Sequence, residues 1–256
     1  FGTALHEVLQ HYLDVMYEKS GAEADRIDIE ELFEETLREC YANDYKKNKG
    51  KHFSSPEELR EFFEDGKAIL NNFKKKKNAH FSKKGWYLVG CELPIVMAPN
   101  LRLNNVKYMG YLDIVMYHEP TNTFKIIDIK TSTKGWGSYA KKDESKQFQL
   151  VLYKYFFSKQ YNVPIENIDI EFFIVRRKVY LGGEYPQKRI QTFTPASGKN
   201  KVNKATTNLN EFINKAFNLD GSYKDTIFNA KPSKWNCNFC PYKQKPELCS
   251  AVGKNF

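Results

Sequence analysis

Two carboxylates and a lysine stand at a spacing that metal-dependent hydrolysis could use. Asp113 lies in a run rich in aromatic and β-branched residues, Val106 to His118, and Asp128 and Lys130 end the apolar run that follows. Such runs predict strands, and the proline and asparagine between them predict a turn. Side chains alternate along a strand, so Asp128 and Lys130 share one face, and the hairpin brings Asp113 within reach of Asp128. Two carboxylates beside an ammonium predict a site for a hard divalent cation.

The acidic-x-Lys spacing carries little weight alone, because the chain is rich in lysine. Asp65-Gly66-Lys67 and Glu144-Ser145-Lys146 have the same spacing, but they lie in polar segments where a solvated charge cluster is the simpler interpretation. Asp128-Ile129-Lys130, in contrast, ends an apolar strand and follows a strand that carries Gly110-x-x-Asp113. The alternative for this hairpin is an ion pair at a strand end without catalytic function.

These motifs resemble those of the PD-(D/E)XK nuclease superfamily, and more closely its RecB-like exonuclease branch, which includes CRISPR-associated exonucleases and AddB-type nuclease domains. The residues that carry the resemblance span the chain: Gly2-x-x-x-His6, Gly110-x-x-Asp113, Asp128-x-Lys130, Gln149-x-x-x-Tyr153, and Cys237, Cys240 and Cys249. The resemblance implies an α/β fold with a restriction-endonuclease-like core. In that core a central mixed sheet is flanked by helices, with an N-terminal helical part and a C-terminal cysteine-rich segment added.

The resemblance also implies a shell of ligands for Mg²⁺ or Mn²⁺. Asp113 is the expected central ligand, and Asp128 and the carbonyl of Ile129 complete the shell. His6 is expected as a further ligand, although its helical pattern alone would make it a hydrogen-bonded histidine at the margin of a core. Glu92, inside a predicted strand, is another candidate carboxylate, with a solvent-facing glutamate as the alternative.

The remaining catalytic roles centre on Lys130. Its ammonium is expected to position or help deprotonate the attacking water and to offset phosphate charge, with a pKa lowered by the neighbouring cation. Gln149 and Tyr153 lie on the predicted helix that follows, and the resemblance implies that they orient Lys130 or the substrate.

Five cysteines, three of them near the C-terminus, favour a metal site in a reducing, cytoplasmic compartment over a disulfide framework. The pair Cys237-x-x-Cys240 suits a tetrahedral Zn²⁺ site. The resemblance favours a 4Fe–4S cluster, in which Cys237, Cys240 and Cys249 join a distant N-terminal cysteine. In the family that cysteine precedes the Gly-x-x-x-His motif, and here none does. Either that ligand lies on a missing N-terminal segment or Cys40, with Cys91 as second choice, replaces it.

The composition indicates a packed globular protein with a polyanionic partner. Of 256 residues 41% are hydrophobic and 15% aromatic, and the net charge of +9 favours nucleic acid, with a basic membrane-surface protein as the rival class. No apolar run is long enough to span a bilayer, and no signal peptide is visible. Basic runs at 46–51, 74–77 and 176–178 are expected to hold the DNA backbone without sequence preference, or else to be solvated faces.

The chain is expected to form a single nuclease domain, 1–256, with a helical part at 1–85, the core at 86–178 and a C-terminal part at 179–256. Periodicity and turn residues predict helices at 3–17, 29–45, 56–75, 144–158 and 205–217, and strands at 86–98, 106–118, 123–129 and 168–175. Segment 180–194 is expected as a hairpin closed at Gly182-Gly183. Segments 131–142 and 194–204 are expected as loops, the first serving as a lid, a base-stacking platform or ordinary packing.

A metal-dependent deoxyribonuclease is therefore expected. By resemblance, it is an exonuclease acting on single-stranded DNA or DNA ends in recombination, repair or CRISPR spacer processing, with a helicase or a recombination or CRISPR protein as partner. Two alternatives stay open: a non-catalytic nucleic-acid-binding scaffold of a helicase–nuclease assembly, and a restriction-type endonuclease. The intact Asp113, Asp128 and Lys130 argue against the scaffold, and a restriction enzyme would leave the C-terminal cysteines without an obvious purpose.

Overall fold

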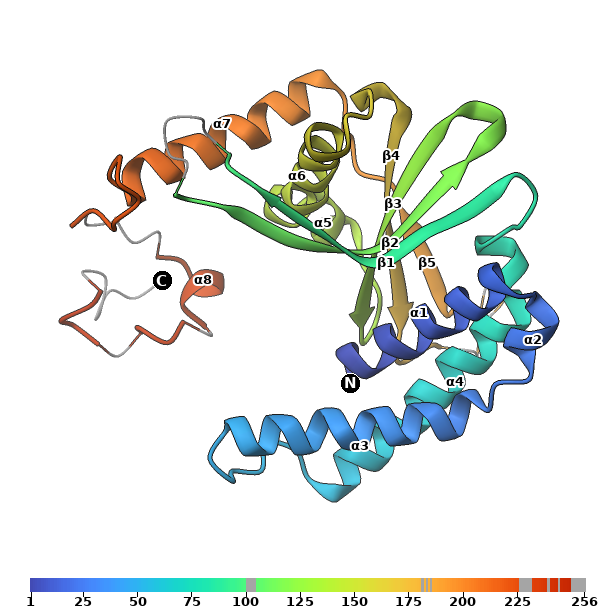
Figure 1. The fold of residues 1–256 in the computed structure, drawn as a ribbon. Helices are drawn as coiled ribbons and strands as arrows, with labels where there is room; N and C mark the ends of the chain where they lie inside the picture. Colours follow the sequence, from blue (N-terminus) through green and yellow to red (C-terminus); the bar gives the residue numbers. More distant parts are fainter. Residues whose placement is uncertain are drawn as a thin grey trace.

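A five-stranded mixed sheet forms the centre of the protein (Figure 1). The computed structural model describes residues 1–99, 105–180, 182, 184, 186–225, 232–238, 240–243 and 245–249. The strands lie side by side in chain order: β1 (Trp86–Met97), β2 (Tyr108–His118), β3 (Thr123–Ser132), β4 (Ile168–Arg176) and β5 (Ile190–Phe193). The pair β3 and β4 is parallel, and the other neighbouring pairs are antiparallel. A parallel pair needs a crossover, and a helix between these two strands supplies it.

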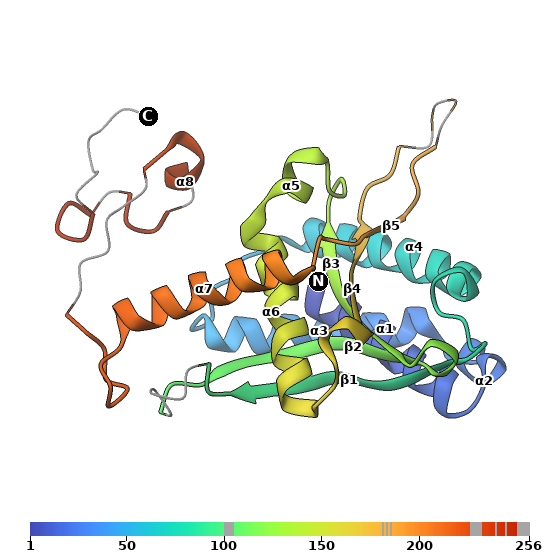
Figure 2. The same cartoon turned by 90° about the horizontal axis from the view of Figure 1, so that it is seen from above.

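Helices cover both faces of this sheet. The helices of the described residues are α1 (Gly2–Glu18), α2 (Gly21–Asp25), α3 (Ile29–Lys47), α4 (Pro56–His80), α5 (Ser138–Lys142), the crossover helix α6 (Glu144–Tyr161), α7 (Lys199–Ala216) and α8 (Lys234–Asn238), with 3₁₀ turns η1 (Glu119–Thr121) and η2 (Ile165–Asn167). Figure 1 shows α1, α3 and α4 on one side of the sheet and α5, α6 and α7 on the other. Seen from above, α6 lies across β1 and β2 (Figure 2). The expected α/β architecture is confirmed.

Local sequence signals account for several helix starts. The Asp28 carboxylate accepts the backbone N–H groups of Glu30 and Glu31 at the start of α3. Ser55 and Glu58 form a reciprocal capping box at the start of α4. These caps satisfy N–H groups that the helix itself leaves unpaired, which is why the helices begin where they do.

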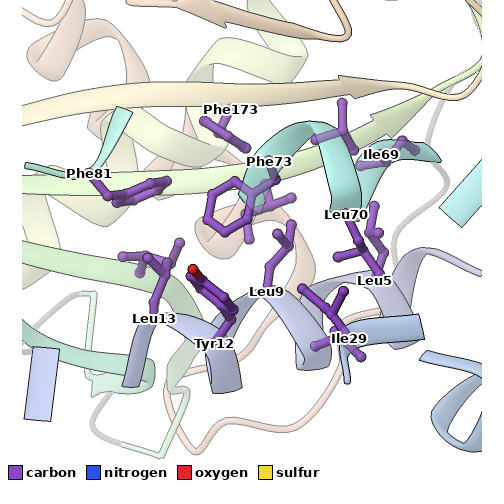
Figure 3. Close-up of a cluster of buried hydrophobic side chains, with 14 of the residues drawn as sticks. Leu5, Leu9, Tyr12, Leu13, Ile29, Ile69, Leu70, Phe73, Phe81 and Phe173 are labelled. Atoms are coloured by element: carbon purple, nitrogen blue, oxygen red, sulfur yellow. The ribbon is translucent and has the colours of Figure 1, made fainter. Parts of the chain in front are cut away.

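The larger hydrophobic cluster joins the N-terminal helices to the sheet (Figure 3). Leu5, Leu9 and Leu13 repeat along α1 at helical spacing and are fully buried. They meet Phe73 of α4 and Phe173 of β4, whose rings lie edge to face at 6.4 Å. The first helix of the chain is therefore fixed rigidly against the sheet.

A second cluster lies on the opposite face, under α6. Leu150, Val151 and Phe157 of α6 pack on residues of β3 and β4, and Tyr108 of β2 stacks on Phe156 at 4.2 Å between ring centroids. The sheet is thus buried on both sides along β3 and β4, which explains why those strands read as almost continuous apolar runs.

Two predicted loops are wrong in part. Residues 138–142 form the short helix α5 inside the segment expected as a loop. Helix α7 begins at Lys199, because Val202 is buried with Ala205 and extends the apolar stripe by one turn, while Lys201 pairs with Glu144 at 2.7 Å. The predicted hairpin at 180–194 closes at Gly182-Gly183, and residue 183 lies outside the described residues. Of that segment, Ile190–Phe193 forms β5, whose antiparallel partner is β4, a strand that ends before the segment begins.

Candidate metal centre and active site

Three side chains that bind metals converge where α1 meets the hairpin β1–β2. One ligand atom each from His6, Glu92 and Asp113 lies within 4.8 Å of the others. His6 Nδ1 is 3.6 Å from Asp113 Oδ2. The group lines a cleft of about 670 Å³ that also contains Ile129 and Lys130. The geometry therefore brings together residues from three elements that are far apart in the sequence.

Strand pairing brings Asp113 beside Asp128 of β3. Ile114 pairs with Ile127, so Asp113 lies opposite Asp128 in the antiparallel register. Asp113 Oδ2 accepts the backbone N–H of Ile129 at 2.6 Å. This bond anchors the same oxygen that lies 3.6 Å from His6 Nδ1. The contact made by Ile129 is through its N–H, and metal coordination by its carbonyl stays a prediction.

Glu92 reaches the site through an irregularity in β1. Register between β1 and β2 shifts by one residue between Leu88 and Gly90, which is the signature of a β-bulge. Glu92 itself has a φ of 50°, a left-handed conformation that costs a non-glycine residue about 1 kcal/mol or more. Strain of this kind persists only where surrounding contacts hold it, and here it sits at a candidate ligand.

Gln10 supplies such a contact and was missed by the sequence reasoning. Its Nε2 donates to Glu92 Oε1 at 2.7 Å and to the carbonyl of Asp113 at 2.9 Å, and the residue is only 6% exposed. The signal was available in the spacing, because Gln10 follows His6 by four residues and so shares its helix face. One glutamine thus ties α1 to both strands that carry candidate ligands.

Asp128 and Lys130 form an ion pair beside this group. Lys130 Nζ is 2.8 Å from Asp128 Oδ2. Asp128 is 2% exposed, and its Oδ2 accepts no well-directed hydrogen bond from the described residues despite that short distance. The same lysine donates to Gln149 Oε1 at 3.1 Å, and Gln149 Nε2 donates to Tyr153 Oη at 3.2 Å. A chain of hydrogen bonds therefore links Tyr153 through Gln149 to Lys130, and the catalytic roles of these residues stay a prediction.

Gly110 makes room for the end of that chain. A Cβ at this position would stand 2.7 Å from Cε1 of Tyr153, closer than real carbon contacts. The glycine of the Gly-x-x-Asp motif thus has a packing reason: it lets the Tyr153 ring approach β2.

Burial sets the protonation behaviour of the carboxylates. It raises the pKa of Asp113 to about 6, with the bond from Ile129 acting against the rise and Glu92 adding to it. Burial likewise raises the pKa of Asp128 to about 6, and the ammonium of Lys130 opposes this rise. Burial lowers the pKa of His6, which favours the neutral imidazole that can bind a metal.

The donor set fits a divalent cation. Like charges held close in a poorly solvated cleft are costly, and a cation would offset that cost. The buried Oδ2 of Asp128, without a well-directed donor, is the kind of atom that a cation or a reoriented lysine would satisfy. Carboxylate oxygens with one imidazole are ligands that Mn²⁺ accepts, and Mg²⁺ shares the preference for oxygen.

The five cysteines lie in two parts of the chain. Cys40 lies on α3 and packs against the N-terminal hydrophobic cluster, as does Cys91 of β1. Cys237 is in α8, and Cys240 and Cys249 follow in turns. Within the described ranges none of these thiols belongs to a group of three ligand atoms within 4.8 Å. The metal cluster stays a prediction.

Two of the three basic runs are engaged in part within the protein. Arg177 Nε and Lys178 Nζ contact the buried carboxylate of Asp65 at 3.1 Å and 2.9 Å. Lys77 pairs with Asp25 at 2.8 Å. These side chains are less available for phosphates than the prediction assumed, because their charges hold α4 to neighbouring segments. The run 46–51, at the end of α3 and beyond, has no ion pair among the described residues.

Trp136, in the segment after β3, packs inside the protein. Trp136 packs on Phe172 at 4.8 Å between ring centroids, and Gln191 bonds both its backbone N–H and its carbonyl. Of the interpretations given for segment 131–142, ordinary packing describes Trp136. Tyr139 of α5, by contrast, is 79% exposed.

The family model of the PD-(D/E)XK nuclease superfamily matches residues 1–245. The chain therefore belongs to this superfamily, whose members are nucleases that use a divalent metal and act on nucleic acid. No curated protein matches the chain closely enough to narrow that assignment. Among the described residues, no helix is both long and apolar enough to cross a membrane.

Proposed function

We propose that this protein is a metal-dependent deoxyribonuclease that hydrolyses phosphodiester bonds in the cleft between α1 and the hairpin β1–β2. The observation that carries the proposal is the convergence of His6, Glu92 and Asp113, with the Asp128–Lys130 ion pair beside them. Within the superfamily, we further propose the RecB-like mode of action, an exonuclease acting on single-stranded DNA or DNA ends. Recombination, repair or CRISPR processing, with a helicase or another protein of that pathway as partner, belongs to the same proposal.

His6, Glu92 and Asp113 would hold the cation, with the buried Asp128 next to them. A bound Mg²⁺ or Mn²⁺ would neutralise charge on the phosphoryl oxygens and lower the pKa of a water molecule. Gln10 fixes Glu92, and the N–H of Ile129 fixes Asp113, so two carboxylates are held before substrate arrives. Such preorganisation avoids paying for reorientation during the reaction.

Lys130 would present its ammonium to the attacking water or the scissile phosphate. Asp128 and Gln149 hold its Nζ from two sides, at 2.8 Å and 3.1 Å. Tyr153 in turn fixes the amide of Gln149. Lys130 is one-third exposed, so the group that is held internally also faces the cleft.

A cleavage assay with matched lysine variants tests this function. Wild-type protein should degrade end-labelled linear single-stranded DNA with Mg²⁺ or Mn²⁺ and not with EDTA. Lys130→Ala should slow cleavage about 10²- to 10³-fold, the size expected for a lost contact to developing charge. Lys125→Ala is the control, since Lys125 lies on the same strand but pairs with Glu171 outside the cleft. Near wild-type turnover by Lys130→Ala would refute the assignment, and cleavage of circular single strands would replace exonuclease with endonuclease.

The C-terminal cysteines are proposed to bind a 4Fe–4S cluster, with Cys40 as the fourth ligand and Zn²⁺ as the alternative metal. Support comes from the sequence spacing of the three cysteines, which stand in α8 and in the short segment that follows it. Protein purified without oxygen should be brown and contain about four irons per chain. Cys237→Ser should remove the colour and lower the melting temperature. One zinc and no colour would replace the cluster with a zinc site, and absence of both metals would reject either.

A further inference from the structure

The metal-site face of β1–β2 continues past the carboxylates as an exposed apolar surface. Alternate residues of a strand share a face, so Met109 and Tyr111 lie on the same side of β2 as Asp113. On β1, Pro94 and Val96 stand directly across, because Pro94 pairs with Tyr111 and Val96 with Met109. We call these four residues the β1–β2 platform.

The platform is open to solvent although it is apolar. Tyr111 is 54% exposed, Met109 62% and Val96 49%. The other face of the same strands is buried, since Leu112 and Ile95 lie in the cluster under α6. Figure 1 shows α6 and α7 on that buried side. Helix α1 lies on the opposite side, under the part of the hairpin where β1 begins and β2 ends. A contiguous apolar surface beside a candidate active site calls for a partner.

We propose that the β1–β2 platform binds the unpaired bases of single-stranded DNA next to the scissile phosphate. The inference rests on the proposed function, because it takes the metal centre as the place of cleavage. Tyr111 is two residues from Asp113, about 6.8 Å along the strand, and Met109 is the same distance further. A base attached to a neighbouring nucleotide would therefore meet the Tyr111 ring. Aromatic rings bind bases of any sequence in this way, and they require the base to be unpaired.

Charge at both ends of the platform complements a phosphate backbone. Lys107, just before β2, is exposed and lies at the next alternate position beyond Met109. At the other end lie the candidate ligands Glu92 and Asp113, whose charge a bound cation would offset, and Lys130 stands beside them in the cleft. Apolar platform residues between two lysines match a strand whose bases stack while its phosphates contact ammonium groups.

The free edge of β1 argues against a peptide as the occupant. An extended peptide would bind by adding a strand at that edge. Gln160 and Tyr161, at the end of α6, already occupy it: both donate to the carbonyl of Pro94, and the N–H of Val96 donates to Gln160. The edge is therefore closed next to the platform, while the face stays open.

Binding is measured without cleavage, by fluorescence anisotropy of a labelled oligothymidylate in Ca²⁺ or EDTA. Tyr111→Ala should weaken binding about tenfold, and Tyr111→Trp should retain it, because loss of stacking on one base has this size. Tyr87→Ala is the matched control, an equally exposed tyrosine on β1 at the far end of the hairpin. Calorimetry with Mn²⁺ checks that Tyr111→Ala keeps its metal affinity and hence its fold.

An oligonucleotide with abasic residues separates stacking from a merely structural effect. Wild-type protein should bind it about tenfold more weakly than the intact strand, while Tyr111→Ala should discriminate little between the two. Equal binding of the two strands by wild-type protein, or wild-type affinity in Tyr111→Ala, would overturn the platform. So would a change in oligomeric state of Tyr111→Ala with unchanged DNA affinity, since the platform would then join two copies of the chain.

Failure of the platform proposal can be told apart from failure of the proposed nuclease function. If wild-type protein cleaves DNA and Tyr111→Ala binds and cleaves equally well, the nuclease assignment stands and the platform falls. If wild-type protein cleaves no DNA with either metal but binds single strands through Tyr111, the nuclease assignment falls and the binding surface stands as a scaffold property.

Discussion

Replacing Asp113 by asparagine should stabilise the metal-free protein. The pKa of this carboxyl is 3.8 without the fold and about 6 within it, so above pH 6 the folded chain must hold a charge that its environment disfavours. A difference of about two pH units corresponds to about 3 kcal/mol, and we expect about 2 kcal/mol because the group is partly solvated. Asparagine keeps an oxygen for the N–H of Ile129 and removes the charge. In a chain of this size the melting temperature should rise by about 4–8 °C.

The difference in stability between wild type and Asp113→Asn should depend on pH. Between pH 4 and 6 the carboxyl is ionised in the unfolded chain but protonated in the fold, so the stability of the wild type falls relative to the variant as pH rises. Above pH 6 the difference should be constant, and near pH 4 it should vanish. Thermal unfolding in EDTA across this range measures it. Asp113→Ala is the control, because it also loses the acceptor for Ile129, which costs about 1–3 kcal/mol.

With Mn²⁺ present, wild-type protein should become more stable than Asp113→Asn. Mn²⁺ binds the folded state and stabilises it by mass action, so wild-type protein should gain stability on addition of Mn²⁺ and Asp113→Asn should gain little. A variant that is no more stable than wild type at pH 7.5 in EDTA, or equally stabilised at pH 4 and pH 7.5, would refute the reasoning about the buried charge.

Three further outcomes are expected. Gln10→Leu should weaken Mn²⁺ binding about tenfold in calorimetry, with circular dichroism unchanged, because Glu92 loses the donor that holds its carboxylate. An undiminished Mn²⁺ affinity would make Gln10 a packing residue only. Gly110→Ala should cost about 1–3 kcal/mol in urea unfolding and slow cleavage, because its methyl meets the Tyr153 ring; wild-type stability would contradict that contact. Asp65→Ala should cost about 1–3 kcal/mol, as it removes the carboxylate that Arg177 and Lys178 share and leaves both with the more exposed Glu61 alone; a change below about 0.5 kcal/mol would show that Glu61 is a sufficient partner.

Sequence pattern predicted the parts of the site that depend on local periodicity. Asp113, Asp128 and Lys130 come together because strand alternation and a short turn determine their register. The strand pattern and the turn can both be predicted from the sequence. The role of Gln10 was not predicted, because its contacts reach across 82 and 103 residues. The bulge in β1 was not predicted either, because it appears only in the pairing of β1 with β2. A local pattern records a residue's own preferences and not its distant partner.

The same limit explains the interpretation of the basic runs. A cluster such as Arg176-Arg177-Lys178 looks free in the sequence, yet Arg177 pairs with Asp65, a residue 112 positions away. Helix α7 shows the opposite case. Val202 carried the signal for the longer helix, but the lysines around it obscured the apolar stripe.

The bonds from Gln10 to Glu92 and Asp113 imply an order of events during folding. They join the first helix to strands more than 80 residues later, so the chain must close long loops before the candidate ligands meet. The sheet's own hairpin contacts are local and can form earlier. Metal affinity should therefore arise in the last kinetic phase of refolding. A fluctuation that lifts α1 from the sheet would release the ion while β1 to β4 remain paired.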